Sequence, residues 1–156
     1  MSAAVQMEPA RPGDEPALRR LLRESPFAGA VSLSLEREPD FQLAAAVEGD
    51  RHDVVVARAP DGRVEGLASR SVRTAWVNGR PARLGYLGQL RAGAGGRGRV
   101  RLLRHGFRLL DAARRPDELP FDLTSIVSDN LPARRLLEAG LPGFPTYRPL
   151  GELVTL

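Results

Sequence analysis

The chain contains no cysteine and no lysine, and these absences exclude several kinds of chemistry. It has 156 residues, all 23 of its basic residues are arginine, and its formal net charge is +4. Without cysteine there is no disulfide, no thiolate metal site and no thiol nucleophile. Without lysine there is neither a Schiff base nor a P-loop lysine. With only two histidines, His52 and His105, we expect no metal site.

Aromatic residues and long apolar runs are also scarce. Aromatics make up 5% of the chain, and a nucleic-acid-binding face usually carries more aromatic residues and more excess positive charge. No apolar run approaches the length of a membrane span, and the N-terminal residues lack the basic region and apolar core of a signal peptide. We therefore expect one globular, cytoplasmic domain over residues 1–156 that binds neither nucleic acid nor membrane.

Apolar spacing and turn residues predict a mixed α/β (α+β) fold with a mostly antiparallel central sheet flanked by helices. Asn78-Gly79 predicts a tight hairpin with both turn residues at positive φ. The strands predicted between Asp53 and Leu90 form an antiparallel meander. The helix after its third strand is predicted to be a right-handed crossover, which brings the next strand in parallel. The predicted elements are an edge strand at 7–11, helices at 14–25 and 39–47, strands at 54–57, 64–77 and 83–90, a helix at 100–114, a strand at 121–127, a helix between Asn130 and Gly140, and a final strand or strand pair at 147–156.

The stretch from Leu84 to Asp111 is a strand, then a glycine- and arginine-rich turn, then a helix. Unpaired N–H groups and the helix dipole make such a junction suited to a phosphate. The arginines nearest the turn, Arg97, Arg99 and Arg101, are the phosphate candidates, whereas Arg104 and Arg108 fit a solvated helix face. The alternative interpretation is a flexible surface loop.

Two segments of the chain resemble the GNAT-type N-acetyltransferases. The first, 90–99 (LRAGAGGRGR), is similar to the strand end and pyrophosphate loop of that family. The second, 128–141 (SDNLPARRLLEAGL), is similar to its "Asn, x, x, Ala, x, x, Leu-Tyr, x, x, x, Gly-Phe" signature, with Asn130, Ala133 and Gly140 among the matching positions. The resemblance implies a splayed sheet with acetyl-CoA between two diverging parallel strands, and direct attack of an amine on the thioester.

The resemblance also implies which residues bind acetyl-CoA, and two departures weaken the match. Val100 and Leu102 stand where the family's loop has small residues, and Leu137 stands where the family commonly has the tyrosine that protonates the leaving thiolate. Tyr147 or water could replace that proton donor, and Tyr86 lies near the end of the third strand, where a base or substrate-orienting group would sit. Tyr86 and Tyr147 are the candidate catalytic residues. The residues expected to bind the acyl donor are Leu90, Arg91, Ala92, Gly96, Arg97, Gly98, Arg99, Val100, Arg101 and Asn130.

No general base is fixed by the sequence. Glu65 and Asp122 lie on predicted strands and are candidates, and Gln89 lies near the end of the third strand, where a substrate-orienting group would sit. We expect His52 on the surface and Trp76 in the packing. Two interpretations remain open: an acetyl-CoA-dependent N-acetyltransferase, or a catalytically inactive GNAT-fold module for binding, regulation or dimerisation. A homodimer built on the terminal strands is compatible with either.

Overall fold

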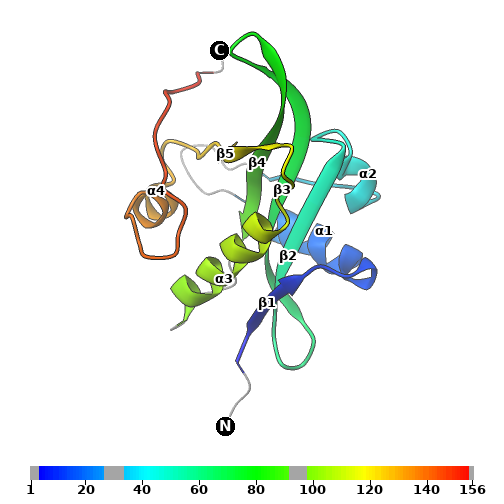
Figure 1. Ribbon diagram of the computed structural model, residues 1–156. Helices are drawn as coiled ribbons and strands as arrows, with labels where there is room; N and C mark the ends of the chain where they lie inside the picture. The colour runs from blue at the N-terminus through cyan, green and yellow to red at the C-terminus, as the bar shows by residue number, and fades with distance from the viewer. Residues whose placement is uncertain (1–3, 27–33, 92–97, 155–156) are drawn as a thin grey trace.

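The computed structural model describes residues 4–26, 34–91 and 98–154 (Figure 1). In this part of the chain the strands are β1 (Gln6–Pro9), β2 (Arg51–Arg58), β3 (Val64–Val77), β4 (Arg80–Arg91) and β5 (Glu118–Leu123). The helices are a short 3₁₀ turn, η1 (Pro12–Asp14), and α1 (Glu15–Glu24), α2 (Phe41–Ala45), α3 (Arg99–Ala112) and α4 (Leu131–Leu137).

The strands form one sheet in the order β1-β2-β3-β4-β5. Neighbouring strands from β1 to β4 are antiparallel, and β5 lies parallel to β4. The reversal follows from α3, because a helix between two neighbouring strands returns the chain to the same end of the sheet. The predicted mixed, mostly antiparallel architecture is confirmed.

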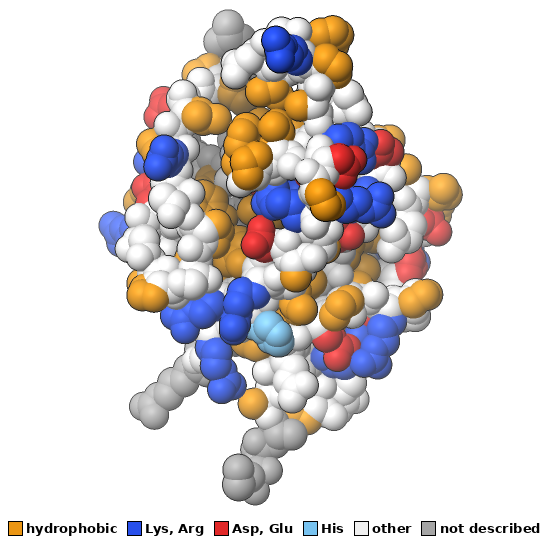
Figure 2. All heavy atoms as spheres, in the orientation of Figure 1, with side chains coloured by type: hydrophobic (Ala, Val, Ile, Leu, Met, Phe, Trp, Pro, Cys, Tyr) orange, Lys and Arg blue, Asp and Glu red, His pale blue; other side chains and the backbone are white. Residues whose placement is uncertain are grey.

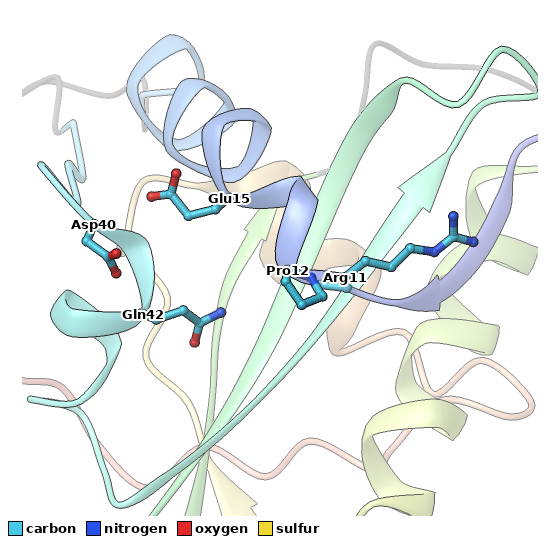
Figure 3. Close-up of a pocket in the computed structure, with 6 residues that line it drawn as sticks. Arg11, Pro12, Glu15, Asp40 and Gln42 are labelled. Atoms are coloured by element: carbon cyan, nitrogen blue, oxygen red, sulfur yellow. The ribbon is translucent and has the colours of Figure 1, made fainter.

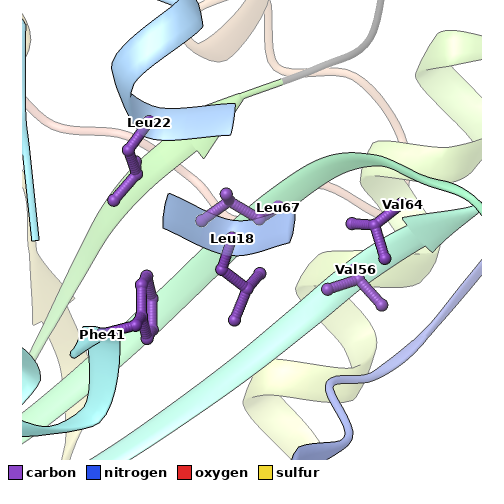
Figure 4. Close-up of a cluster of buried hydrophobic side chains, with 6 residues drawn as sticks. All are labelled: Leu18, Leu22, Phe41, Val56, Val64 and Leu67. Carbon is purple, nitrogen blue, oxygen red and sulfur yellow. The ribbon is translucent and has the colours of Figure 1, made fainter. Parts of the chain in front are cut away.

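Helices cover both faces of the sheet. On one face, α1 and α2 bury an apolar cluster against β2 and β3 (Figure 4), formed by Leu18, Leu22, Phe41, Val56, Val64 and Leu67. On the other face α3 packs against β1 and β2 (Figure 1), with Leu110 against Met7 and Val55. Gly106 allows this close approach, since a Cβ there would lie 2.8 Å from the Met7 methyl carbon.

Local sequence signals predict the β3–β4 hairpin turn and the start of α4 correctly. Asn78 and Gly79 have φ of 50° and 76°, so the predicted hairpin turn is confirmed. The Asn130 side chain accepts a hydrogen bond from Ala133 N and caps α4. Asp40 caps α2 in the same way, through Leu43 N at 2.8 Å, but the helix is shorter than the predicted 39–47.

Three sequence predictions about the fold are wrong. β5 spans Glu118–Leu123 rather than 121–127. It starts early because the Glu118 carboxylate is buried by ion pairs that fix the strand start. Residues 145–154 form neither helix nor strand; Tyr147 packs against Phe107 of α3, and Leu153 is 96% exposed. Trp76 is 78% exposed at the β3–β4 hairpin rather than packed, because the hairpin extends beyond the covering helices (Figure 1).

Candidate functional site

The two parallel strands β4 and β5 separate at Tyr86. Their pairing ends with Tyr86 opposite Leu123, and beyond it the edge of β4 has no strand partner in the described part of the chain. The Tyr86 hydroxyl lies 2.5 Å from Ser125 Oγ and bridges the two chains at the split. Among the described residues, β5 therefore leaves part of the β4 edge uncovered beyond the split.

A β-bulge lies on β4 just past this split. The register with β3 passes from Gly88 opposite Ser69 to Arg91 opposite Leu67, so Gln89 and Leu90 together face a single residue of β3. Gln89 has φ of 56°, which is uncommon for a residue other than glycine. A bulge turns backbone N–H groups out of the ladder, and bulges of this kind recur beside active sites.

The first turn of α3 has no side-chain cap. Gly98, with φ of 108°, is the N-cap residue and offers no side-chain cap, so the first N–H groups of the helix are not satisfied by a cap. Arg99 and Arg101 are exposed beside them, and Figure 2 shows basic side chains gathered over the start of α3. The predicted donor-binding residues Ala92, Gly96 and Arg97 lie outside the described residues.

The two bulky residues at the predicted loop point in different directions. Val100 is 39% exposed in the first turn of α3, next to the uncapped N–H groups. Leu102 is half-buried and packs with the apolar cluster under α3. Only Val100 therefore stands at the approach to the uncapped N–H groups, and Leu102 serves the core. Leu137 is buried in α4 and supplies no proton donor.

Arg91 is not an exposed phosphate ligand. Its side chain is buried, and its Nε donates to the Ser25 carbonyl at 2.8 Å, at the C-terminal end of α1. Burial lowers the pKa of the Arg91 guanidinium. The side chain ties the end of β4 to α1, so any role of Arg91 in donor binding is left to its backbone.

The two candidate tyrosines lie in different surroundings. Tyr86 is 40% exposed at the split. Tyr147 lies against Phe107, and burial, together with the negative charge of Asp122, raises the pKa of Tyr147 to about 12. A phenol with a raised pKa gives up its proton less readily, so Tyr86 is the better placed candidate for protonating a leaving group.

Asp122 is committed to a buried ion network and is not a free base. Arg70, fully buried on β3, donates to Asp122 at 2.9 Å and to Glu118 at 2.8 Å. Arg114, just past the end of α3, donates to Asp122 at 2.8 Å. The network crosses β4 at Gly85, where a Cβ would lie 1.9 Å from Asp122 Oδ1. It fixes β5 relative to β3 and so sets where β4 and β5 part.

A second polar cluster lies on the opposite face, beside the bulge. We define the cluster by Arg37, Glu48, His52, Ser71 and Gln89. Glu48 accepts from Arg37, and also from Ser71 Oγ at 2.9 Å. His52 Nδ1 lies 2.7 Å from Ser71 Oγ, and the His52 side chain is only 7% exposed. The prediction of a surface His52 is therefore wrong, because cross-strand pairing with Ser71 turns it under α2.

This cluster was missed from the sequence except for Gln89. The available signal was the run Ser69-Arg70-Ser71 in the middle of a long strand, since consecutive polar residues place polar groups on both faces of a covered sheet. Glu65, the other candidate base, pairs with Arg63 at 2.8 Å near the start of β3.

An open hollow of about 380 Å³ lies elsewhere, between η1, α1 and α2 (Figure 3). Its acidic groups are engaged in structure: Glu15 accepts from Phe41 N at 2.9 Å, and Asp40 caps α2. It adjoins the β1 side of the sheet, away from the split. The described residues contain no metal-binding group of acidic or histidine side chains, and none of their helices is long and apolar enough to cross a membrane.

No family model matches the chain, and no curated protein matches it in sequence, whereas solved structures match its fold. An acetyltransferase from Trypanosoma brucei aligns with a TM-score of 0.60 at 15% identity, over 97% of this chain and 99% of its own. A glucosamine-6-phosphate N-acetyltransferase from Arabidopsis thaliana gives 0.58 at 11% identity, over 98% and 100%. An aminoglycoside 6′-N-acetyltransferase from Acinetobacter haemolyticus gives 0.54 at 15% identity, over 96% and 99%.

The chain therefore has the fold of the GNAT-type N-acetyltransferases, as its sequence resemblance predicts. At such low identity the likeness is one of fold, so function must be argued from the residues of this chain.

Proposed function

We propose that this protein is an acetyl-CoA-dependent N-acetyltransferase that acetylates an amine by direct attack on the thioester. The observation that carries the proposal is the β4 bulge at Gln89, directly beyond the point where β4 and β5 separate. In the described part of the chain this stretch of β4 has no β5 partner, and the bulge interrupts its ladder with β3. Backbone N–H groups at such a bulge can hydrogen-bond a thioester carbonyl whose oxygen gains negative charge during attack.

The uncapped start of α3 supports binding of the donor's phosphates. Its N–H groups, its dipole, and the exposed Arg99 and Arg101 all favour an anion. Leu90, Gly98, Val100 and Asn130 complete the described part of the proposed donor site. Val100 narrows the approach to the N–H groups, which predicts weaker pyrophosphate binding than a glycine would allow.

The reaction needs no covalent enzyme intermediate. An ammonium group first loses one proton, and the free nitrogen lone pair then forms the C–N bond to the acetyl carbon. The C–S bond breaks, coenzyme A leaves as a thiolate, and the nitrogen loses a second proton. Tyr86 is placed to protonate the thiolate, because it lies exposed at the split.

Thiol release from acetyl-CoA in the presence of primary amines tests this function. We expect amine-dependent release of coenzyme A together with a product heavier by one acetyl group by mass spectrometry. The rival proposal, an inactive module for binding or dimerisation, is motivated by Leu137 in place of a proton-donating tyrosine. That rival predicts acetyl-CoA binding, or a homodimer, without any amine-dependent release.

A further inference from the structure

The polar cluster beside the bulge has unsatisfied groups that its structural role does not explain. Nε2 of His52 and Nη1 of Arg37 are both buried without a hydrogen-bond partner among the described residues. A buried polar group without a partner loses its hydration and gains nothing in return. Two of them in one cluster indicate that these side chains are retained for something other than stability.

Hydrogen bonding fixes the state of each member of the cluster. The Gln89 amide turns its oxygen toward Arg37 and accepts from Nε at 2.9 Å, because its NH₂ group there would face two guanidinium donors. Ser71 has one hydroxyl proton and donates it to Glu48, so His52 Nδ1 must donate to Ser71. Burial, with the nearby charge of Arg37, lowers the pKa of His52 and keeps it neutral.

Glu48 is the member of the cluster that reaches solvent. Its side chain is 32% exposed, whereas the Arg37 side chain behind it is 4% exposed and lies over the Phe41 ring, 5.0 Å from its centroid. A carboxylate offers about four lone-pair positions, and Arg37 and Ser71 fill two of them. A group arriving from solvent therefore meets an oriented carboxylate with room for further donors.

This carboxylate adjoins the proposed reaction centre. Gln89 is itself the bulge residue, and its amide oxygen accepts from the same Arg37 guanidinium that donates to Glu48. The two other acidic side chains nearest the split in sequence, Asp122 and Glu118, are on the α3 side of the sheet and are paired with Arg70. Glu48 is thus the acidic group available beside the bulge on the α1–α2 face.

We propose that Glu48 is the acceptor-binding carboxylate, and that the acceptor is an alkyl primary amine that arrives as an ammonium cation. The ammonium donates to Glu48 and is thereby held beside the bulge, where its free-base form attacks the acetyl carbon. Arg37 and Ser71 are positioning residues that hold the carboxylate in one rotamer, and Gln89 acts on it through Arg37. This inference rests on the proposed acetyltransferase function and adds the substrate class to it.

A pair of isomeric amines separates charge from size. Phenethylamine is an ammonium cation at neutral pH, whereas its isomer 4-ethylaniline is neutral. Steady-state rates with acetyl-CoA are measured for the wild-type chain and for Glu48→Gln, which keeps the shape of the side chain and removes its charge. Because a hydrogen bond to a charged group contributes about 1.5 to 3 kcal/mol, we expect the KM for phenethylamine to rise by about tenfold or more. The KM for 4-ethylaniline should not change.

Glu8→Gln is the matched control. Glu8 is 26% exposed and accepts from Arg58 at 2.5 Å, but it lies on β1, at the far edge of the sheet from the split. Its kinetics should equal those of the wild type. If Glu48→Gln fails to fold, Glu48→Asp keeps the charge but withdraws it by one methylene, and the same selective rise in KM is expected.

The outcomes distinguish this inference from the proposed function. Acetyl-CoA binding, measured by calorimetry, should be the same in the wild type and in Glu48→Gln. Equal effects on both isomers, no effect on either, or turnover of 4-ethylaniline without turnover of phenethylamine would overturn the assignment of Glu48. Failure of the wild-type chain to bind acetyl-CoA, or binding without turnover of either amine, would instead overturn the acetyltransferase proposal itself.

Discussion

Gly85→Ala should strongly destabilise the protein through the buried ion network. The new Cβ would lie 1.9 Å from Asp122 Oδ1 and 2.6 Å from Arg70 Nη2. Both side chains are buried, so neither can move away into solvent. In a strand, alanine alone is favoured over glycine by about 0.5 to 1 kcal/mol. Breaking a buried ion pair costs about 3 to 5 kcal/mol. The net expectation is a loss of about 2 to 4 kcal/mol, a large part of the stability of an ordinary domain.

Urea unfolding followed by circular dichroism measures this loss, with Gly13→Ala as the control. A Cβ at Gly13 has no heavy atom within 4 Å, so that variant should unfold like the wild type. If Gly85→Ala also unfolded with the free energy of the wild type, the close crossing of Arg70 and Asp122 over β4 would be wrong. The argument that this network sets the β4–β5 split would fail with it.

Three further predictions concern charge and proton transfer. Burial raises the pKa of Glu118, but hydrogen bonding and charge from Arg70 outweigh it and hold that pKa below its ordinary value of 4.5. The ionised Glu118 should therefore stabilise the fold fully above pH 4.5, and this stabilisation should be lost as the pH falls through the lowered pKa. In Glu118→Gln the urea midpoint should fall less steeply as the pH is lowered. Arg101→Ala should weaken acetyl-CoA binding in calorimetry by about fivefold, which corresponds to the loss of about 1 kcal/mol of phosphate contact. Arg108→Ala, two turns further along α3, should leave binding unchanged. Equal losses in the two variants would assign the phosphates to the helix face. Tyr86→Phe should lower kcat in the thiol-release assay by about a hundredfold if its hydroxyl protonates the thiolate, and Tyr147→Phe should not; the reverse order would exchange their roles.

The sequence was most informative where local rules decide structure. Asn78-Gly79 requires a hairpin because two successive residues at positive φ fit little else. Asn130 caps α4 through its own side chain, so three residues suffice to predict the start of that helix. The order of the elements then restricts the topology, because two neighbouring strands joined by a helical crossover run parallel.

The sequence was least informative where the bounds of an element depend on contacts between residues far apart in the chain. The start of β5 depends on Glu118 meeting Arg70 and Arg51, which lie 48 and 67 residues away. The predicted strand at 147–156 has a composition suited to a strand. In the structure Tyr147 packs on Phe107 instead, and residues 147–154 do not extend the sheet. Apolar spacing gives no information about such competition.

The candidate site divides in the same way. The junction of strand, turn and helix before Arg99 is visible as a motif, although part of its turn lies outside the described residues. Gln89 was placed correctly near the end of the third strand, β4, whereas its role toward a substrate stays a prediction. Glu48 and His52 were not recognised, because only the register of β2 against β3 brings His52 to Ser71, and only the chain reversal at Gly49 brings Glu48 to both.

Binding of acetyl-CoA to the wild-type chain can be measured by titration in a calorimeter. We expect saturable binding of one acetyl-CoA per chain, competed by free coenzyme A and weakened by Arg101→Ala, since the phosphates are proposed to lie at the start of α3. No heat at millimolar acetyl-CoA would contradict it, because a split sheet with a bulge and an uncapped helix would then hold no acyl donor.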